Sequence, residues 1–272
     1  MEDQDSREEK IQPALREIRS NKSWRVVGVS APGTSHTRLG IPCQDSNLSE
    51  ILPSGSLVTV VADGAGSAAH AELGSQLAVR TVINEARRSE VQLASLTAEE
   101  PCKALLKEWA MAACKAIAGE ASKLDVTPRE LATTLIILTA TPRFIGAAQI
   151  GDGATVFRNS RGEIRTLTTP KLEEYINEST FLSSPGVEES IQLEVWEGEV
   201  SQVAALSDGL QMLALQFPGP VAHKPFFEPL FDFVAQTNST EDLEQAVQAF
   251  LDSQRIRDRS DDDLTLLLAH RM

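Results

Sequence analysis

The residues of this sequence best suited to chemistry are aspartates that stand where apolar runs end. Three Asp-Gly pairs, Asp63-Gly64, Asp152-Gly153 and Asp208-Gly209, follow such runs. Another apolar run begins directly after Asp261-Asp262-Asp263, and Asp45 precedes a further candidate strand. One Asp-Gly pair alone predicts only a turn. Three pairs, each at the end of a buried strand, predict a cluster of carboxylates.

Clustered carboxylates repel one another, and such clusters are stabilised by bound cations or by shared protons. Ligands that are all oxygen atoms select hard ions, so Mg²⁺ or Mn²⁺ is expected rather than zinc. The sequence contains no HExxH motif that would offer a competing site. Its 3 cysteines lack CxxC spacing, which argues against a disulfide scaffold or zinc knuckle and favours a reducing cytoplasm.

A competing motif overlaps the first Asp-Gly pair. Residues 64–69 (GAGSAA) match G-x-G-x-x-G/A between a predicted strand and a predicted helix, and Glu85 lies at a suitable distance for a ribose contact. A dinucleotide-binding enzyme without metal dependence is therefore an alternative. Two features argue against it: Asp63 would aim a negative charge at the pyrophosphate, and the next strand, near residue 131, is too distant for a βαβ unit of about 30 residues.

The elements that must position these aspartates follow from the apolar periodicity. Strands are expected at residues 24–30, from 43 toward 52, and at 57–62, 131–139, 144–150, 154–158, 164–167, 191–195, 203–206 and 264–269. Helices are expected at residues 68–88, 101–123, 210–217 and 240–256. The strand at 154–158 is expected to pair back on 144–150 as a hairpin, and the segments 31–36, 89–100, 168–190 and 218–229 to be loops or turns. Clustered strands with helix pairs between them favour an α+β fold.

The composition limits the class of protein. We expect residues 1–22 to form a weakly ordered extension and residues 23–272 a single domain, because no linker or repeat divides them. The formal net charge of −14 argues against nucleic acid or an anionic membrane as partner. The acidic N-terminus does not resemble a secretory signal, and no apolar run reaches the roughly 20 residues of a membrane span. A cytoplasmic protein is expected.

Six short motifs occur in an order that resembles the type-2C metal-dependent protein phosphatase family, over residues 25–270. They are Gln44-Asp45, Val61-Ala62-Asp63-Gly64-x-Gly66, Ala132-Thr133-Thr134-Leu135, Ile150-Gly151-Asp152-Gly153, Ser207-Asp208-Gly209-Leu210 and Asp262-Asp263-Leu264-Thr265. The Ser35-His36 pair, the run Pro42-Cys43-Gln44-Asp45 and residues 175–182 are similar to a bacterial branch of that family.

The resemblance implies a four-layer α-β-β-α sandwich, with two antiparallel sheets flanked by helix pairs and two Mn²⁺ or Mg²⁺ ions at one end. It also implies hydrolysis of phosphoserine and phosphothreonine in proteins, by in-line attack of a water that bridges the ions. The substrates would be those of a counterpart Ser/Thr kinase. The implied metal ligands are Asp63 as the bridging residue, the Gly64 carbonyl, Asp208 and Asp262 on the first ion, Asp45 directly or through water, and Asp152 at a third, weaker site.

Three positions depart from the family pattern. Gln44 replaces a glutamate and would be a weaker ligand, Gly40 stands where the phosphate-binding arginine is usual, and Ala65 stands where some members have a general-acid histidine. His36 is the candidate general acid, and His36 or Arg38 the candidate phosphate ligand. The departures leave an alternative from another class: a phosphatase-like regulatory module that binds phosphorylated partners without turnover.

Overall fold

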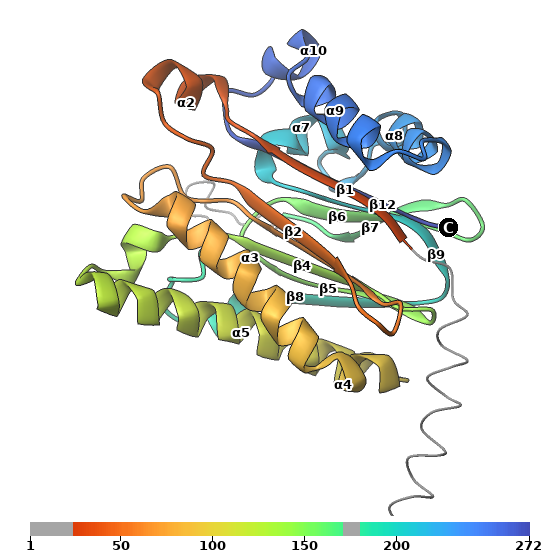
Figure 1. Ribbon diagram of the computed structural model, residues 1–272, viewed down its shortest axis with the longest axis horizontal. Coiled ribbons are helices and arrows are strands. Elements are labelled where there is room, and N and C mark those ends of the chain that lie inside the picture. Colours follow the sequence, from red (N-terminus) through yellow and green to blue (C-terminus); the bar gives the residue numbers. More distant parts are fainter. Residues whose placement is uncertain (1–23, 171–179) are drawn as a thin grey trace, which may run out of the picture.

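The computed structural model describes residues 24–170 and 180–272 of the chain (Figure 1). The predicted N-terminal extension and Tyr175 therefore lie outside the described residues. Within the described residues, no helix has both the length and the apolar character needed to cross a membrane.

Two five-stranded sheets pack face to face, and every strand pair in them is antiparallel. The first sheet has the order β2 (Ser46–Ile51), β3 (Leu57–Ala62), β4 (Leu135–Ala140), β5 (Phe144–Ile150) and β8 (Gln192–Glu197). The second has the order β1 (Trp24–Ala31), β12 (Leu264–Arg271), β9 (Val200–Leu206), β6 (Ala154–Asn159) and β7 (Ile164–Thr168).

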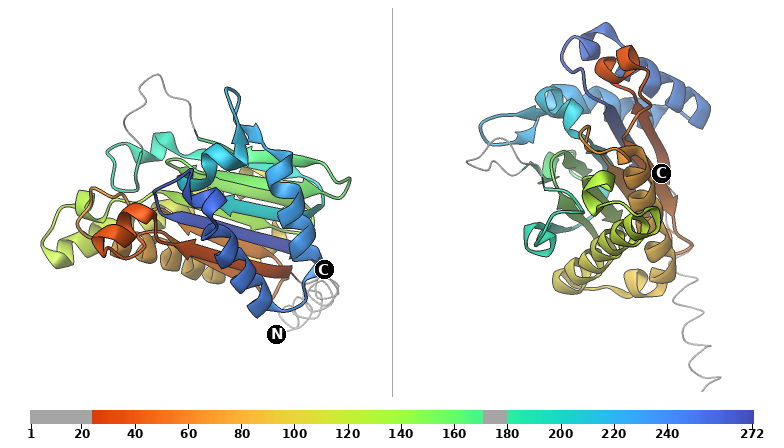
Figure 2. Two further views of the ribbon diagram at one scale, coloured as in Figure 1. Left: turned by 90° about the horizontal axis from the view of Figure 1, so that it is seen from above. Right: turned by 90° about the vertical axis from the view of Figure 1, so that its left-hand side faces the viewer.

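Helices cover the outer face of each sheet (Figures 1 and 2). The first sheet is covered by α3 (Ala71–Arg88) and α5 (Glu99–Leu124), with the short α4 (Glu90–Ser95) between them. The second is covered by α8 (Lys224–Gln236) and α9 (Thr240–Leu251), and the Ser239 side chain caps α9 by accepting a hydrogen bond from the Asp242 N–H. The predicted α+β, four-layer sandwich is confirmed.

The central strands are buried on both faces, which explains their unbroken apolar runs. Side chains along β3 alternate, so Val58 and Val60 face the helices while Leu57 and Val61 face the second sheet. Both sets are almost completely buried. The interior is therefore filled mainly by apolar side chains, and the predicted aspartates lie beyond the strand ends.

The predicted hairpin between residues 144–150 and 154–158 is wrong. β5 and β6 belong to different sheets, and β6 pairs with β7 and β9 instead. The intervening turn uses Gly151 and Gly153 at positive φ, 87° and 102°, and a Cβ on Gly153 would lie 2.6 Å from the Leu206 carbonyl oxygen. The turn thus carries the chain from one sheet to the other and places Asp152 between them.

Residues 218–229 do not form the predicted loop throughout, because α8 begins at Lys224. Pro225 lies in its first turn, where a proline costs no helical hydrogen bond, and Phe227, Phe231 and Val234 are completely buried. The apolar spacing of these side chains outweighs the effect of Pro229 inside the helix.

Short elements differ from expectation in four other places. Helical turns occur where loops were expected, within residues 31–36, 89–100 and 168–190, and the predicted helix at 210–217 ends early. The remaining elements are α2 (Thr34–Leu39), η1 (Pro128–Leu131), α6 (Val187–Ser190), η2 (Asp208–Leu210), α7 (Gln211–Ala214), β10 (Leu215–Gln216), β11 (Val221–Ala222) and α10 (Gln254–Arg257).

Candidate metal centre

The strand register brings the predicted aspartates to one end of the sandwich. Ser46 of β2 pairs with Ala62 of β3, and Ala154 of β6 and Leu266 of β12 both pair with Leu206 of β9. The residues just beyond these pairs are Asp45, Asp63, Asp152, Asp208 and Asp263. The two sheets therefore contribute acidic residues to a common edge.

Three of these carboxylates form a close group. One carboxylate oxygen each from Asp63, Asp152 and Asp208 lies within 4.8 Å of the other two. Asp63 follows β3 of the first sheet, Asp208 follows β9 of the second, and Asp152 lies in the turn that connects the sheets. The three Asp-Gly pairs singled out in the sequence thus meet in space.

Two threonines fix the backbone that carries Asp63. The Thr133 hydroxyl and the Thr134 N–H both donate to the Asp63 carbonyl oxygen, at 2.9 and 2.8 Å, and the Asp63 N–H donates to the Thr134 hydroxyl at 3.1 Å. Gly64 lies so close to its neighbours that a Cβ would be 2.7 Å from the Gln44 carbonyl oxygen. The Ala132-Thr133-Thr134 motif and Gly64 therefore hold Asp63 in place.

Asp45 is 5 % exposed, and its Oδ2 accepts a hydrogen bond of 2.7 Å from the Thr265 hydroxyl. Among residues 24–170 and 180–272, no donor reaches three other buried oxygens of this region, Asp45 Oδ1, Asp208 Oδ1 and Gln44 Oε1. Buried acceptors without a partner are unfavourable, since they lose their hydrogen bonds to water. Oxygens of this kind suit a hard cation, so the donor set fits Mn²⁺ or Mg²⁺.

Burial and mutual repulsion make these carboxylates hard to ionise together. The pKa of Asp45 is raised to about 6 and that of Asp208 to about 7, and burial is the largest cause of each shift. Repulsion from Asp152 and Asp262 contributes to the raised pKa of Asp208, whereas the Thr265 hydroxyl opposes the shift at Asp45. The pKa of Asp63 is raised well above its usual value by burial and by Asp45 and Asp208. A bound cation would favour the charged forms.

We predict that the metal-free protein loses stability as pH rises through these values. An acid whose pKa is higher in the folded state binds more protons when folded, so its contribution to stability falls between its unfolded and folded pKa values. For Asp208 this interval runs from 3.8 to about 7. Thermal unfolding in EDTA should give a lower Tm at pH 8 than at pH 5.5, and Asp208→Asn should reduce that difference. A pH-independent Tm, equal in both proteins, would contradict the prediction.

Asp262 lies at the start of β12, outside the group of three carboxylates. Its Oδ1 accepts a hydrogen bond of 2.8 Å from the Asp263 N–H. Burial raises its pKa, and repulsion from Asp263 adds to that shift. Asp262 therefore shares the electrostatic environment of the site.

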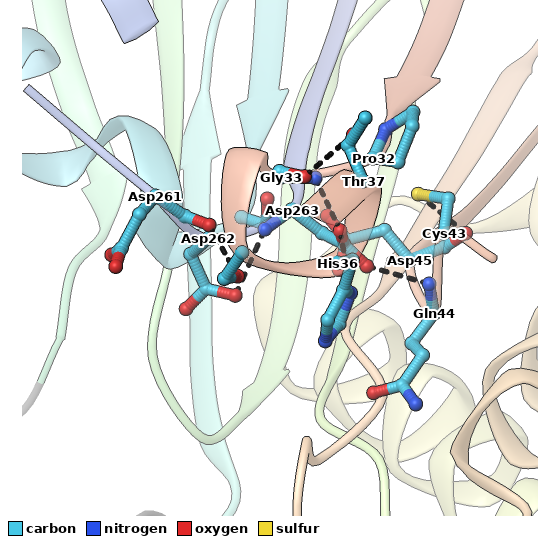
Figure 3. A network of polar contacts seen from close by, with 12 residues as sticks. Pro32, Gly33, His36, Thr37, Cys43, Gln44, Asp45, Asp261, Asp262 and Asp263 are labelled. Atoms are coloured by element: carbon cyan, nitrogen blue, oxygen red, sulfur yellow. Dashed lines mark hydrogen bonds and ion pairs between the residues drawn. The ribbon is translucent and has the colours of Figure 1, made fainter. Parts of the chain in front are cut away.

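The sequence assigned no role to Asp263, yet this residue is 2 % exposed and accepts three hydrogen bonds (Figure 3). The donors are the Gly33 N–H at 2.6 Å, the Gln44 N–H at 2.6 Å and His36 Nδ1 at 2.9 Å. The sequence placed Asp263 in a run of three aspartates and in the motif Asp262-Asp263-Leu264-Thr265, but neither distinguishes a buried acid from an exposed one.

The two candidate phosphate ligands lie differently on α2. The His36 side chain is 13 % exposed and contacts Asp263, a neighbour of Asp262. Arg38 is exposed, and its Nε donates to the Thr34 carbonyl of the same helix at 3.2 Å. His36 therefore lies nearer to the acidic residues, while Arg38 lies on the exposed part of α2.

Gln149 is a second residue that the sequence did not single out. It is 2 % exposed, and its Nε2 donates to the carbonyl oxygens of Gly151 and Gly153, at 3.2 and 3.1 Å. These carbonyls flank Asp152. The Gln149 amide thus bridges the turn that presents Asp152 to the other carboxylates.

We predict that Gln149→Met lowers stability by about 1–3 kcal/mol, because methionine fills a similar volume but leaves the buried Gly153 carbonyl and the half-buried Gly151 carbonyl without their donor. Urea unfolding measures this change, and Gln92→Met, at an exposed position of α4, is the matched control. Equal stability of the two variants would show that the bridge has no role in holding the turn.

Residues 64–69 do not form the phosphate loop of a dinucleotide-binding enzyme. That loop connects two parallel strands through a helix. Here β3 pairs with β4, the next strand in the chain, in antiparallel orientation. The geometry excludes this alternative.

Comparisons with known proteins agree with this architecture. Residues 32–252 match the family model described as protein phosphatase 2C. The chain is 33 % identical over 256 residues to serine/threonine-protein phosphatase 3 of Escherichia coli (strain K12), with 91 % of this chain and 98 % of that protein aligned.

Solved structures with lower identity share the fold. Staphylococcus aureus serine/threonine phosphatase Stp1 superposes with a TM-score of 0.63 at 14 % identity, covering 93 % of this chain and 96 % of that one. The catalytic domain of serine threonine protein phosphatase PstP, in complex with 2 manganese ions, gives 0.59 at 20 % identity, covering 91 % and 97 %. RsbX in complex with magnesium gives 0.54 at 16 % identity, covering 93 % and 97 %.

Proposed function

Because the chain belongs to the protein phosphatase 2C family, we propose that it is a metal-dependent phosphatase that hydrolyses phosphoserine and phosphothreonine in proteins. The observation that carries this proposal is the group of three carboxylates, Asp63, Asp152 and Asp208, within 4.8 Å of one another. The Escherichia coli relative is named as a serine/threonine-protein phosphatase, and structures of the same fold contain manganese or magnesium.

We assign the predicted ligands to Mn²⁺ or Mg²⁺ as a proposal. Asp63, the Gly64 carbonyl, Asp208 and Asp262 would hold the first ion, with Asp63 shared by the second. Asp45 and Gln44 would support the second ion, and Asp152 a third. When bound, such ions lower the pKa of water and neutralise charge on a phosphoryl group.

Hydrogen bonds hold two of the proposed metal ligands, Asp63 and Asp45, in place without a substrate. Thr133 and Thr134 fix the backbone at Asp63, and Thr265 fixes one oxygen of Asp45. Groups held in this way need little reorganisation when charge develops during reaction. The formal net charge of −14 is compatible with a phosphate substrate, because cations at the site would supply the positive field.

We assign to His36 a contact with the substrate phosphate and the delivery of a proton to the leaving group. Its support is its place beside Asp263 and its small exposure, 13 %. Arg38, which is exposed on the same helix, would provide a second contact to the phosphate. These two residues would take the roles left open by Gly40 and Ala65.

The partners and the location of the protein follow from the same proposal. Phosphoserine and phosphothreonine proteins would be its substrates, and a Ser/Thr kinase its biological counterpart. A cytoplasmic enzyme is part of the same proposal and is supported by the three cysteines, Cys43, Cys102 and Cys114, which are all free.

Turnover separates this proposal from a module that only binds phosphorylated partners. The purified protein should release phosphate from a phosphothreonine peptide and from p-nitrophenyl phosphate with Mn²⁺. Calorimetry on the same preparation would report Mn²⁺ binding. Stoichiometric metal binding without release of phosphate from any phosphopeptide tested would support the binding module and overturn the proposed enzyme.

A further inference from the structure

Asp263 connects the start of β12 with a segment more than 200 positions earlier in the chain. Its Oδ1 accepts hydrogen bonds from the Gly33 N–H and from His36 Nδ1, and its Oδ2 accepts one from the Gln44 N–H. Both oxygens of this buried carboxylate are therefore occupied by the segment from residue 33 to residue 44 (Figure 3).

The backbone at the start of this segment contacts Asp261, which lies two residues before Asp263. The Ser35 N–H and hydroxyl both donate to the Asp261 carbonyl, at 3.1 and 2.6 Å. A Cβ on Gly33 would lie 2.4 Å from the Asp261 carbonyl oxygen, so only glycine fits there. The start of α2 thus lies in contact with the chain just before β12, and His36 is carried on that short helix.

We propose that Asp263 is a positioning residue, which orients the His36 ring and holds residues 33–44 against the metal centre. A carboxylate oxygen only accepts hydrogen bonds, so the contact requires the hydrogen on His36 Nδ1 and leaves Nε2 for other partners. The importance of this orientation for turnover rests on the proposed function, in which His36 contacts the substrate. The orientation itself does not depend on that function.

Asparagine at position 263 would not replace the carboxylate. Three N–H donors surround the side chain, and an asparagine offers them one oxygen and an NH₂ group. At least one donor would then face the NH₂ group. Asp263→Asn therefore changes the contacts without changing the size of the side chain.

The first measurement concerns the ring itself. In ¹⁵N NMR spectra of the wild-type protein, neutral His36 should carry its hydrogen on Nδ1, and Asp263→Asn should shift it toward the Nε2 form. Hydrogen exchange at the amides of Gly33 and Gln44 should become faster in the same variant. Asp261→Asn, an exposed neighbour, is the matched control and should change neither. An unchanged tautomer with unchanged exchange would overturn the proposal.

The second measurement is a double-mutant cycle on kcat/KM for a phosphopeptide. Asp263→Asn should lower kcat/KM about 10- to 100-fold, as is typical for residues that orient a functional histidine. In the His36→Gln background the same substitution should lower kcat/KM by less than about threefold, because only the contacts to the Gly33 and Gln44 amides remain to be lost. An equal reduction of kcat/KM in both backgrounds would show that Asp263 does not act through His36. If the wild type shows no turnover, the proposed function fails, whereas the NMR and exchange results still decide the orientation.

Discussion

Asp63→Asn is expected to lower kcat/KM for a phosphopeptide by at least about 1,000-fold, equivalent to about 4 kcal/mol of lost transition-state stabilisation. Asp63 follows β3, and Asp45, Asp208 and Asp262 all contribute to the electrostatic environment of its carboxylate. Asparagine keeps the shape of the side chain and removes the charge that would bind the cations. The fold should be retained, since the backbone contacts of residue 63 with Thr133 and Thr134 remain possible.

Steady-state kinetics with saturating Mn²⁺ measures this loss. Asp125→Asn is the matched control, because Asp125 is exposed, lies after α5 and has a positive φ of 56° that asparagine readily adopts. The control should keep wild-type activity. Full activity in Asp63→Asn would show that the metal centre has been assigned to the wrong residues.

Asp208→Asn should lower turnover to a similar extent. It should also raise the stability of the metal-free protein. Burial and repulsion from Asp152 and Asp262 raise the pKa of Asp208 to about 7, so its charge is unfavourable in the metal-free protein. At pH 8 the variant should therefore unfold at a higher temperature than the wild type in EDTA. A stabilisation of 1 kcal/mol corresponds to about 2–4 °C.

Thermal unfolding with and without Mn²⁺ separates the contribution of Asp208 to metal binding from its effect on the stability of the metal-free protein. Mn²⁺ should raise the Tm of the wild type, because a ligand that binds only the folded state stabilises it. The rise should be smaller in Asp208→Asn. A variant that is less stable in EDTA and retains the full Mn²⁺-induced rise would show that residue 208 supports the fold and does not bind metal.

The sequence predicts the central strands best. β3 and β5 match the predicted ranges to the residue, because strands buried on both faces have unbroken apolar runs bounded by turn residues. The same boundaries placed Asp63 and Asp152 at strand ends. The four-layer sandwich was implied by the family resemblance that the motifs carry, and its layers are confirmed.

Pairing between strands was harder to predict, because it depends on contacts that local sequence does not encode. A short Gly-Asp-Gly connection is typical of a hairpin, yet Gly151 and Gly153 carry the chain between two sheets. The backbone contact of Gly153 with Leu206, a residue more than 50 positions later, permits this path. Only the tertiary structure reveals that contact.

The supporting side chains of the site were missed for a similar reason. Asp263 and Gln149 act on residues 33–44 and on the turn around Asp152, and nothing in their local sequence distinguishes them from ordinary polar residues. Aspartates at strand ends follow a visible pattern. Residues that hold those aspartates, or the loops around them, become apparent only from hydrogen bonds over long sequence separations.

The most direct test of the central claim is phosphate release from a phosphothreonine peptide by wild-type protein that has been stripped with EDTA and then supplied with Mn²⁺. The metal centre built from Asp63, Asp152 and Asp208 predicts background release in the chelator and recovery of turnover when Mn²⁺ is restored. Phosphate release that continues at an undiminished rate in EDTA would contradict the account.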